Sequence, residues 1–290
     1  MVWLFVVGTG LDYKQLPSQQ KLHLRGDHMI RIDHLLRMKR EDRPFSCVTC
    51  YEASFAQLLE RAEVETILVG DSLGNVVQGQ ASTVPVTLEH MAYHVSNVAR
   101  GNSHALIIGD LPFMSYSTVS QGLDSARVLM QAGAHMVKLE GGAEFAPLVR
   151  ALKSAGAPVC AHLGLTPQSV NVMSGYKVQG KTSETAQKLL DDAKALEEAG
   201  AQLLVVECIP DSLGEQLSRE LSIPVIGIGA GAGTDGQVLV MHDLLGVTKK
   251  PPKFSKNFLA QAGGVEAAFV QFRKEVAARD FPAREHSFGG

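Results

Sequence analysis

The chain has 290 residues, of which 45% are hydrophobic, and its formal net charge is −3. This composition is typical of a globular protein with a large core, and it excludes the disordered and membrane-spanning classes. A nucleic-acid-binding surface is also excluded, because even the densest basic stretch, residues 37–43, contains Glu41 and Asp42. We therefore expect neither nucleic acid nor a membrane as a partner.

The chain opens with MVWLFVVGTG, in which seven apolar residues precede Gly8. This run is too short to span a membrane, and it lacks the basic flank of a signal peptide. We therefore interpret residues 1–28 as an N-terminal extension outside the fold, and we expect residues 29–290 to form one domain. The four cysteines are too few to crosslink a chain of this size, which indicates a reducing compartment and a cytoplasmic location.

From residue 45 onward, short apolar runs alternate with longer helical stretches. The runs are continuously apolar, as in parallel strands that are covered on both faces, and the helices supply the crossovers. Three joins from a helix to the next strand share Ala-Gly-Ala, at residues 132–134, 155–157 and 199–201, so that a glycine stands where each helix ends. In chain order the runs are FSCVTCY, TILVGD, ALIIGD, HMVKLE, PVCAHL, QLLVVE, PVIGIG and QVLVMHD. These eight units predict a (β/α)8 TIM barrel, with a doubly wound sheet as the alternative.

Two short motifs within these units carry weak signals. Cys47 and Cys50 form a C-x-x-C without a second pair, and residues three apart on a strand point to opposite faces. We interpret them as buried thiols rather than as a zinc or redox site. Gly231, Gly233 and Gly236 form a G-x-G-x-x-G, but they follow a late strand. We attribute these glycines to close backbone approach or to a tight turn at the barrel rim.

Polar side chains close five successive runs, because strands two to six end in Asp71, Asp110, Glu140, His162 and Glu207. The carboxyl ends of barrel strands form the active-site face, so we expect these side chains to converge on one cavity. Four acids in one pocket repel one another unless a cation lies among them, and a hard divalent metal is the simplest such cation. The alternative for each acid is a helix cap or an ion pair.

The donor atoms favour Mg²⁺ over zinc, because oxygen ligands suit Mg²⁺ and zinc usually recruits Cys or His. His162 nearby keeps zinc and cobalt as alternatives. Lys138 lies two residues before Glu140, so both side chains point to the same side of their strand. Two roles remain open for Lys138, neutralising Glu140 or binding an anionic substrate. Two also remain for His162, a core histidine or a catalyst.

A series of longer motifs carries a family resemblance. They are VGDSLG, STVPVTLEHMAYH, DLPFMSY, MVKLEGG, HLGLTPQSVN, GYKVQG, VVECIP and PVIGIGAG, then TDGQVLVMHDLLG and the terminal EHSF. In this order, from about Ile32 to Phe288, they closely resemble the ketopantoate hydroxymethyltransferase family, and a shared barrel alone would not produce them.

The resemblance implies a metal-dependent (β/α)8 barrel. Such an enzyme transfers a hydroxymethyl group from methylenetetrahydrofolate, a co-substrate, to 3-methyl-2-oxobutanoate. The product is 2-dehydropantoate (ketopantoate), the precursor of pantothenate and coenzyme A. The resemblance also implies a homo-oligomer, often a decamer.

Carried over to matching residues, the resemblance implies one metal ion per subunit. Asp71 and Asp110 would hold the ion directly, and Glu140 would support it, partly through water. Ser72 and Lys138 would bind the carboxylate and keto oxygen of the oxo acid beside Asp71 and Asp110.

The resemblance also implies that Glu207, in VVECIP, is the general base for the C3 proton of the oxo acid. Tyr51, His162 and Ser174 fall in motifs that line the same pocket. A carbon–carbon lyase or mutase of the phosphoenolpyruvate mutase/isocitrate lyase type is the alternative function, because it would share the barrel, the metal and a 2-oxo acid. A non-catalytic metabolite-binding barrel is a further alternative, and the presence of both the carboxylates and Glu207 argues against it.

Overall fold

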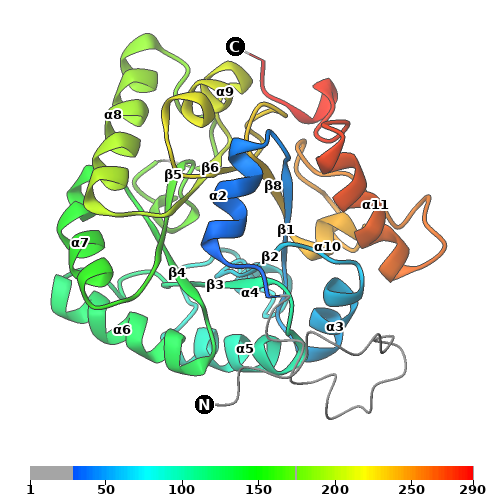
Figure 1. Cartoon of the computed structure of the whole chain (residues 1–290), viewed down its shortest axis with the longest axis horizontal. Coiled ribbons are helices and arrows are strands. Elements are labelled where there is room, and N and C mark those ends of the chain that lie inside the picture. Colours follow the sequence, from blue (N-terminus) through cyan, green and yellow to red (C-terminus); the bar gives the residue numbers. More distant parts are fainter. Residues whose placement is uncertain (1–28, 174, 290) are drawn as a thin grey trace, which may run out of the picture.

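The computed structural model describes residues 29–173 and 175–289, and in it eight parallel strands close into one barrel (Figure 1). Each strand pairs with the next in the sequence, and the last pairs with the first. The closed barrel confirms the predicted (β/α)8 fold over the doubly wound alternative. The interpretation of residues 1–28 as an extension lies outside the described residues. The strands are β1 (Phe45–Thr49), β2 (Thr66–Val69), β3 (Leu106–Asp110), β4 (Met136–Glu140), β5 (Val159–Gly164), β6 (Leu203–Glu207), β7 (Val225–Ile228) and β8 (Gly236–Leu239).

Helices cover the outside of the barrel and alternate with the strands (Figure 1), except that a loop without a helix, residues 229–235, joins β7 to β8. Thr118 and Thr182 cap two of them by accepting a backbone N–H of the first turn. Gly133, Gly156 and Gly200 have positive φ at or just after helix ends, as the Ala-Gly-Ala joins predicted. Over the described part of the chain, none of the helices is long and apolar enough to cross a membrane. The helices are α2 (Ile32–Arg40), α3 (Ala53–Arg61), α4 (Leu73–Val76), α5 (Leu88–Gly101), α6 (Val119–Ala132), α7 (Ala146–Ser154), α8 (Ser183–Ala199), α9 (Asp211–Glu220), α10 (Met241–Leu244) and α11 (Val265–Ala277).

Side chains on each strand alternate between two cores. On β1, Phe45 and Cys47 belong to the core inside the barrel, and Val48 belongs to the core between strands and helices. Every strand residue is buried except Glu207, which is half-buried. Burial on both faces explains why the strand sequences are continuously apolar.

The two weak motifs have structural roles. Cys47 lies in the inner core and Cys50 in the outer core, and burial raises the pKa of each thiol to about 12. All four cysteines are free and buried, which confirms the interpretation as buried thiols. In the glycine-rich loop, a Cβ on Gly231 would lie 2.5 Å from the Cβ of Asp211 at the start of α9. The glycine therefore serves the close approach of this loop to α9.

Helix α2 covers the amino end of the barrel (Figure 1). Its Leu35 is 1% exposed and joins the inner core. The N–H of Ile30 donates to the carbonyl of His104, just before β3, over 2.7 Å. Lys39 Nζ lies 2.7 Å from Asp235 Oδ2, just before β8. These contacts seal the amino end, so the carboxyl end is the open face.

Candidate active site

A cavity of about 620 Å³ lies at the carboxyl ends of the strands, a size usual for small-molecule sites. The convergence of strand ends predicted from the sequence is therefore confirmed as a spatial arrangement. Ser174 lies outside the described residues, and Tyr51 lies behind the wall of the cavity. The other predicted site residues all line it, namely Asp71, Ser72, Asp110, Lys138, Glu140, His162 and Glu207.

Strand alternation places four of these side chains directly. Asp110, Glu140 and Glu207 are the last residues of β3, β4 and β6. Lys138 precedes Glu140 by two positions on β4, so both point to the same side of the strand, as the spacing predicted, and that side faces the cavity. Because all eight strands are parallel, their carboxyl ends meet at one face of the barrel.

Asp71 and His162 reach the cavity in ways that the sequence prediction did not describe, because neither is the last residue of a strand. β2 ends at Val69, and Asp71 stands in the turn before α4. Alternation alone would point Asp71 outward, since Gly70 faces the cavity. The turn brings Asp71 back to the cavity, where it is 4% exposed. His162 lies within β5, two residues before its end at Gly164.

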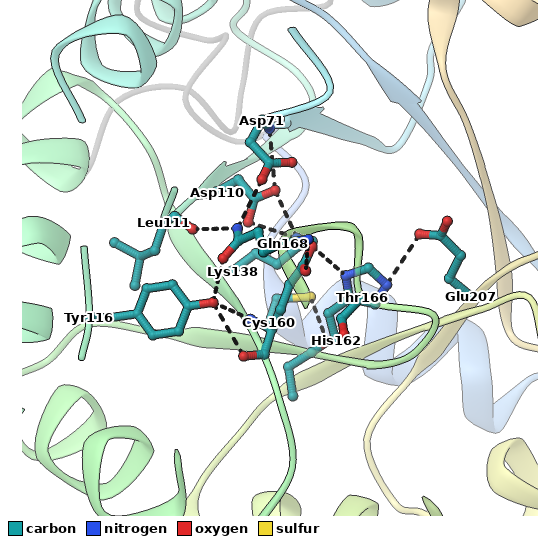
Figure 2. A network of polar contacts seen from close by, with 12 residues as sticks. Asp71, Asp110, Leu111, Tyr116, Lys138, Cys160, His162, Thr166, Gln168 and Glu207 are labelled. Atoms are coloured by element: carbon teal, nitrogen blue, oxygen red, sulfur yellow. Dashed lines mark hydrogen bonds and ion pairs between the residues drawn. The ribbon is translucent and has the colours of Figure 1, made fainter. Parts of the chain in front are cut away.

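Three carboxylates form the centre of the site (Figure 2). Asp71, Asp110 and Glu140 each offer an oxygen, and these oxygens lie within 4.8 Å of one another. Lys138 Nζ lies 2.7 Å from both carboxylate oxygens of Asp110 and 3.3 Å from Glu140 Oε1. The backbone N–H of Asp71 donates to Asp110 Oδ2 over 3.3 Å. Lys138 therefore pairs mainly with Asp110.

The cluster carries excess negative charge, because one ammonium faces three carboxylates. Burial, Asp110 and Glu140 raise the pKa of Asp71 well above its usual value. Burial also raises the pKa of Asp110, although Lys138 opposes it. For Glu140, Lys138 and His162 outweigh burial and lower the pKa to about 2. A buried, oxygen-only donor set with excess negative charge fits a hard divalent cation such as Mg²⁺.

His162 separates Glu207 from the carboxylate cluster (Figure 2). Its Nδ1 lies 3.2 Å from Glu140 Oε1, and its Nε2 lies 3.3 Å from Glu207 Oε2 without good hydrogen-bond alignment. Burial and Lys138 lower the pKa of His162, but Glu140 and Glu207 raise it by more, so that the resulting pKa is about 9. Glu207 therefore faces the cavity from across the imidazole, with its side chain 16% exposed.

The backbone around Glu207 is tightly constrained. Gly164 pairs with Glu207 in the barrel and has φ +90°. A Cβ on Gly164 would overlap the carbonyl oxygen of Glu207. Cys208, next in the chain, has φ +48°, a conformation that costs a non-glycine residue about 1–2 kcal/mol. The end of β6 is thus held in place at some local cost, as is common at functional sites.

Tyr51 supports Ser72 from behind the cavity wall. Tyr51 is 3% exposed and does not itself line the cavity. Its hydroxyl lies 2.9 Å from both Ser72 Oγ and Thr49 Oγ1, and these two residues do line it. The pocket-lining role expected for Tyr51 is corrected to a contact one layer behind the wall.

Two buried residues at the cluster, Gln168 and Tyr116, were not identified from the sequence. Gln168 lies in the short helix η4 (Pro167–Ser169) and donates from Nε2 to Asp71 Oδ2 over 2.9 Å. Tyr116 donates to Gln168 Oε1 over 2.6 Å. Both stand in motifs that carried the family resemblance, HLGLTPQSVN and DLPFMSY, but neither is charged. The pattern of charged residues at the strand ends therefore gives no sign of them.

Comparisons with known proteins agree on one family. A family model described as "Ketopantoate hydroxymethyltransferase" matches residues 29–284. A protein of Psychrobacter sp. (strain PRwf-1) named 3-methyl-2-oxobutanoate hydroxymethyltransferase is 54% identical, covering 90% of this chain and all of that protein. A protein of the same name from Idiomarina loihiensis is 57% identical, covering 88% of this chain and 96% of that protein.

A solved structure of 2,3-dimethylmalate lyase, described as a member of the PEP mutase/isocitrate lyase superfamily, has a TM-score of 0.54. It is 16% identical to this chain, and the match covers 74% of this chain and 83% of that one. At this identity the likeness shows the fold alone. The lyase or mutase alternative is therefore not favoured.

Proposed function

The chain belongs to the ketopantoate hydroxymethyltransferase family, and from that premise we propose that it transfers a hydroxymethyl group from methylenetetrahydrofolate to 3-methyl-2-oxobutanoate, giving 2-dehydropantoate. The observation that carries this proposal is the juxtaposition of an oxygen-donor cluster with a separate carboxylate, Glu207, in one cavity. The cluster suits a cation that binds the oxo acid, and Glu207 suits a base.

In this proposal Asp71 and Asp110 hold one Mg²⁺ ion and Glu140 supports it, with Zn²⁺ or Co²⁺ as the alternatives. Bound there, the ion would supply positive charge to the keto and carboxylate oxygens of the oxo acid and so stabilise the enolate. Lys138 and Ser72 bind the same oxygens from the cavity wall. Lys138 keeps its contact with Asp110 and thereby limits the charge that the cluster presents.

Glu207 accepts the C3 proton of the oxo acid. A carboxylate suits this step because it faces the cavity from across His162, away from the oxygens of the cluster. Both carbon–nitrogen bonds of the donor's one-carbon unit break, and this carbon forms one bond to the enolate carbon and one to the oxygen of a water molecule. The C3 proton taken by Glu207 and one proton from that water go to the two folate nitrogens.

The size of the cavity supports a second, larger substrate. A five-carbon oxo acid is far too small to fill about 620 Å³. Beyond the carboxylates, the cavity is lined by aromatic side chains that suit a flat ring system, namely Tyr176, Phe254 and Phe288. We place the folate donor there. The homo-oligomer that the family resemblance implies, with a decamer as the expected form, is part of the same proposal, and sedimentation velocity tests it.

The proposed activity is tested by incubating purified protein and Mg²⁺ with 3-methyl-2-oxobutanoate and methylenetetrahydrofolate. We expect 2-dehydropantoate, detected by mass spectrometry. The matched control is 3,3-dimethyl-2-oxobutanoate, which has no C3 hydrogen and should give no product. Absence of 2-dehydropantoate would overturn the proposal, and release of pyruvate or glyoxylate from a panel of candidate substrates would favour the lyase or mutase class.

A further inference from the structure

Gln168 contacts two of the three clustered carboxylates, and its contact with Asp71 can be followed in Figure 2. Its side-chain Nε2 donates to Asp71 Oδ2 over 2.9 Å, and its backbone N–H donates to Glu140 Oε2 over 3.0 Å. Gln168 is 4% exposed, so water does not compete for these bonds. One residue on the loop after β5 thus ties together the carboxylates that follow β2 and end β4.

The orientation of the Gln168 amide is fixed by its partners. Nε2 makes a second bond, to the carbonyl of Leu111 over 2.9 Å, so both of its hydrogens are used. Oε1 accepts from the hydroxyl of Tyr116 over 2.6 Å. A flipped amide would set Oε1 against the carboxylate of Asp71 and the carbonyl of Leu111. The Tyr116 hydroxyl accepts the backbone N–H of Glu140 over 3.3 Å. Its one hydrogen has two acceptors within reach, and Gln168 Oε1 at 2.6 Å is nearer than the carbonyl oxygen of Glu140 at 3.2 Å.

Gln168 differs from Lys138 in what it does to the charge of the cluster. Lys138 neutralises one carboxylate. Gln168 is a neutral donor, so it can hold Asp71 and Glu140 close together without reducing the negative charge available to a cation. When neutral donors hold carboxylates close together, the carboxylates keep their negative charge. A divalent ion then gains the most favourable electrostatic free energy on binding.

We propose that Gln168 is a positioning residue that holds the Asp71 and Glu140 carboxylates in place for the metal ion, and that Tyr116 acts through it by fixing the amide. This inference rests on the proposed metal site. It adds two residues on the loops after β3 and β5 to the metal site, although neither would touch the ion.

The test measures metal affinity rather than turnover. Mn²⁺ binding is followed by electron paramagnetic resonance, and Mg²⁺ binding by calorimetry, in wild type, Gln168→Met, Tyr116→Phe and the double variant. Loss of such supporting contacts typically weakens metal binding about 10–100-fold, and we expect this for Gln168→Met. Tyr116→Phe should weaken binding in the same direction. The double variant should bind the metal no more weakly than Gln168→Met alone, because both changes disrupt the same hydrogen-bonded arrangement of the Gln168 amide.

Gln237→Met is the matched control, because Gln237 is a buried amide that donates to Gly231 and Thr234, away from the cluster. It should lower thermal stability and leave Mn²⁺ affinity unchanged. Should Gln168→Met fail to fold, Tyr116→Phe carries the test, since it removes a single hydroxyl. Wild-type affinity in the folded variants, or additive losses, would overturn the inference about Gln168. Failure of the wild type to bind Mn²⁺ or Mg²⁺ would instead overturn the metal site itself.

Discussion

The ammonium of Lys138 lies 2.7 Å from both carboxylate oxygens of Asp110, and both side chains are almost fully buried. Removal of one partner from such a pair leaves an uncompensated buried charge. Lys138→Met should therefore lower the free energy of unfolding by about 3–5 kcal/mol in metal-free protein. Because a divalent ion can replace part of the lost positive charge, Mg²⁺ should recover some of this loss. Urea unfolding with EDTA and with Mg²⁺ measures both quantities.

Lys194→Met is the control for Lys138→Met. Lys194 on α8 pairs with Glu220 at the end of α9, and their side chains are 47% and 30% exposed. Exposed pairs contribute little to stability, so this change should be nearly neutral. Equal effects of the two changes would show that Lys138 does not hold the cluster together.

Asp71→Asn should stabilise the metal-free protein near neutral pH and weaken Mg²⁺ binding by at least about tenfold. The pKa of Asp71 is raised in the folded state above its ordinary value of 3.8, so its ionised form opposes folding. Protonated Asp71 stabilises the folded state. This stabilisation is fully present below pH 3.8 and is lost as the pH rises through the pKa of Asp71 in the folded protein. Asparagine does not ionise and keeps this stability. Unfolding in EDTA across pH, with calorimetry for Mg²⁺, provides the measurement, and lower stability of the variant in EDTA would contradict the prediction.

Glu207→Gln should slow the exchange of the C3 hydrogen of 3-methyl-2-oxobutanoate with deuterated water by about 10²–10⁴-fold. Glutamine keeps the volume of the side chain but does not accept the proton, so binding of Mg²⁺ and of the oxo acid should persist. Proton NMR on metal-saturated protein follows the exchange. Glu220→Gln, at an exposed position on α9, is the control and should exchange at the wild-type rate. Wild-type exchange in Glu207→Gln would remove Glu207 from the mechanism and leave His162 as the next candidate.

Gly164→Ala should lower kcat by about 10²-fold, the usual effect of displacing a catalytic group by about 1 Å. The added Cβ would overlap the carbonyl oxygen of Glu207 and push the end of β6 away. Gly156→Ala is the matched control, because Gly156 has nearly the same φ, +87° against +90°, and its Cβ would meet nothing within 4 Å. Both variants should lose similar stability from the positive φ, and Gly164→Ala should lose more because its Cβ also overlaps the backbone of Glu207. Equal losses of kcat would show that strain, rather than the position of Glu207, is responsible.

Deletion of residues 1–28 should leave the melting temperature within about 2 °C of the full chain, because the barrel begins after them. Deletion of residues 1–40 also removes α2 and uncovers the inner core around Leu35. That longer deletion should lower the melting temperature strongly or prevent folding. Calorimetry of the two truncated chains, with sedimentation to monitor assembly, gives the comparison, and a large effect of the shorter deletion would place residues 1–28 within the folded unit.

The barrel was predictable because parallel strands that are buried on both faces leave a strong one-dimensional signal. That Lys138 and Glu140 point to the same side of their strand followed from their spacing of two. The position of Asp71 did not follow, because it depends on a turn after β2 that reverses the direction expected from alternation. Gln168 was missed for a different reason. A neutral side chain gives no sign of a function in the sequence. The role of Gln168 is indicated only by its hydrogen bonds to Asp71 and Tyr116 in the structure.

The helix across the amino end of the barrel has a kinetic consequence for the proposed reaction. Within the described part of the chain, α2 and the inner core block that end, so reactants share the entrance at the opposite face. The clustered carboxylates are buried, whereas Tyr176 is 58% exposed and Phe254 and Phe288 are half-buried, so the aromatic side chains are nearer to solvent. The small oxo acid must therefore enter before the bulky donor, and the new hydroxy acid leaves only after the spent folate has gone. Initial-rate kinetics should accordingly show a compulsory order, with the oxo acid first on and its product last off.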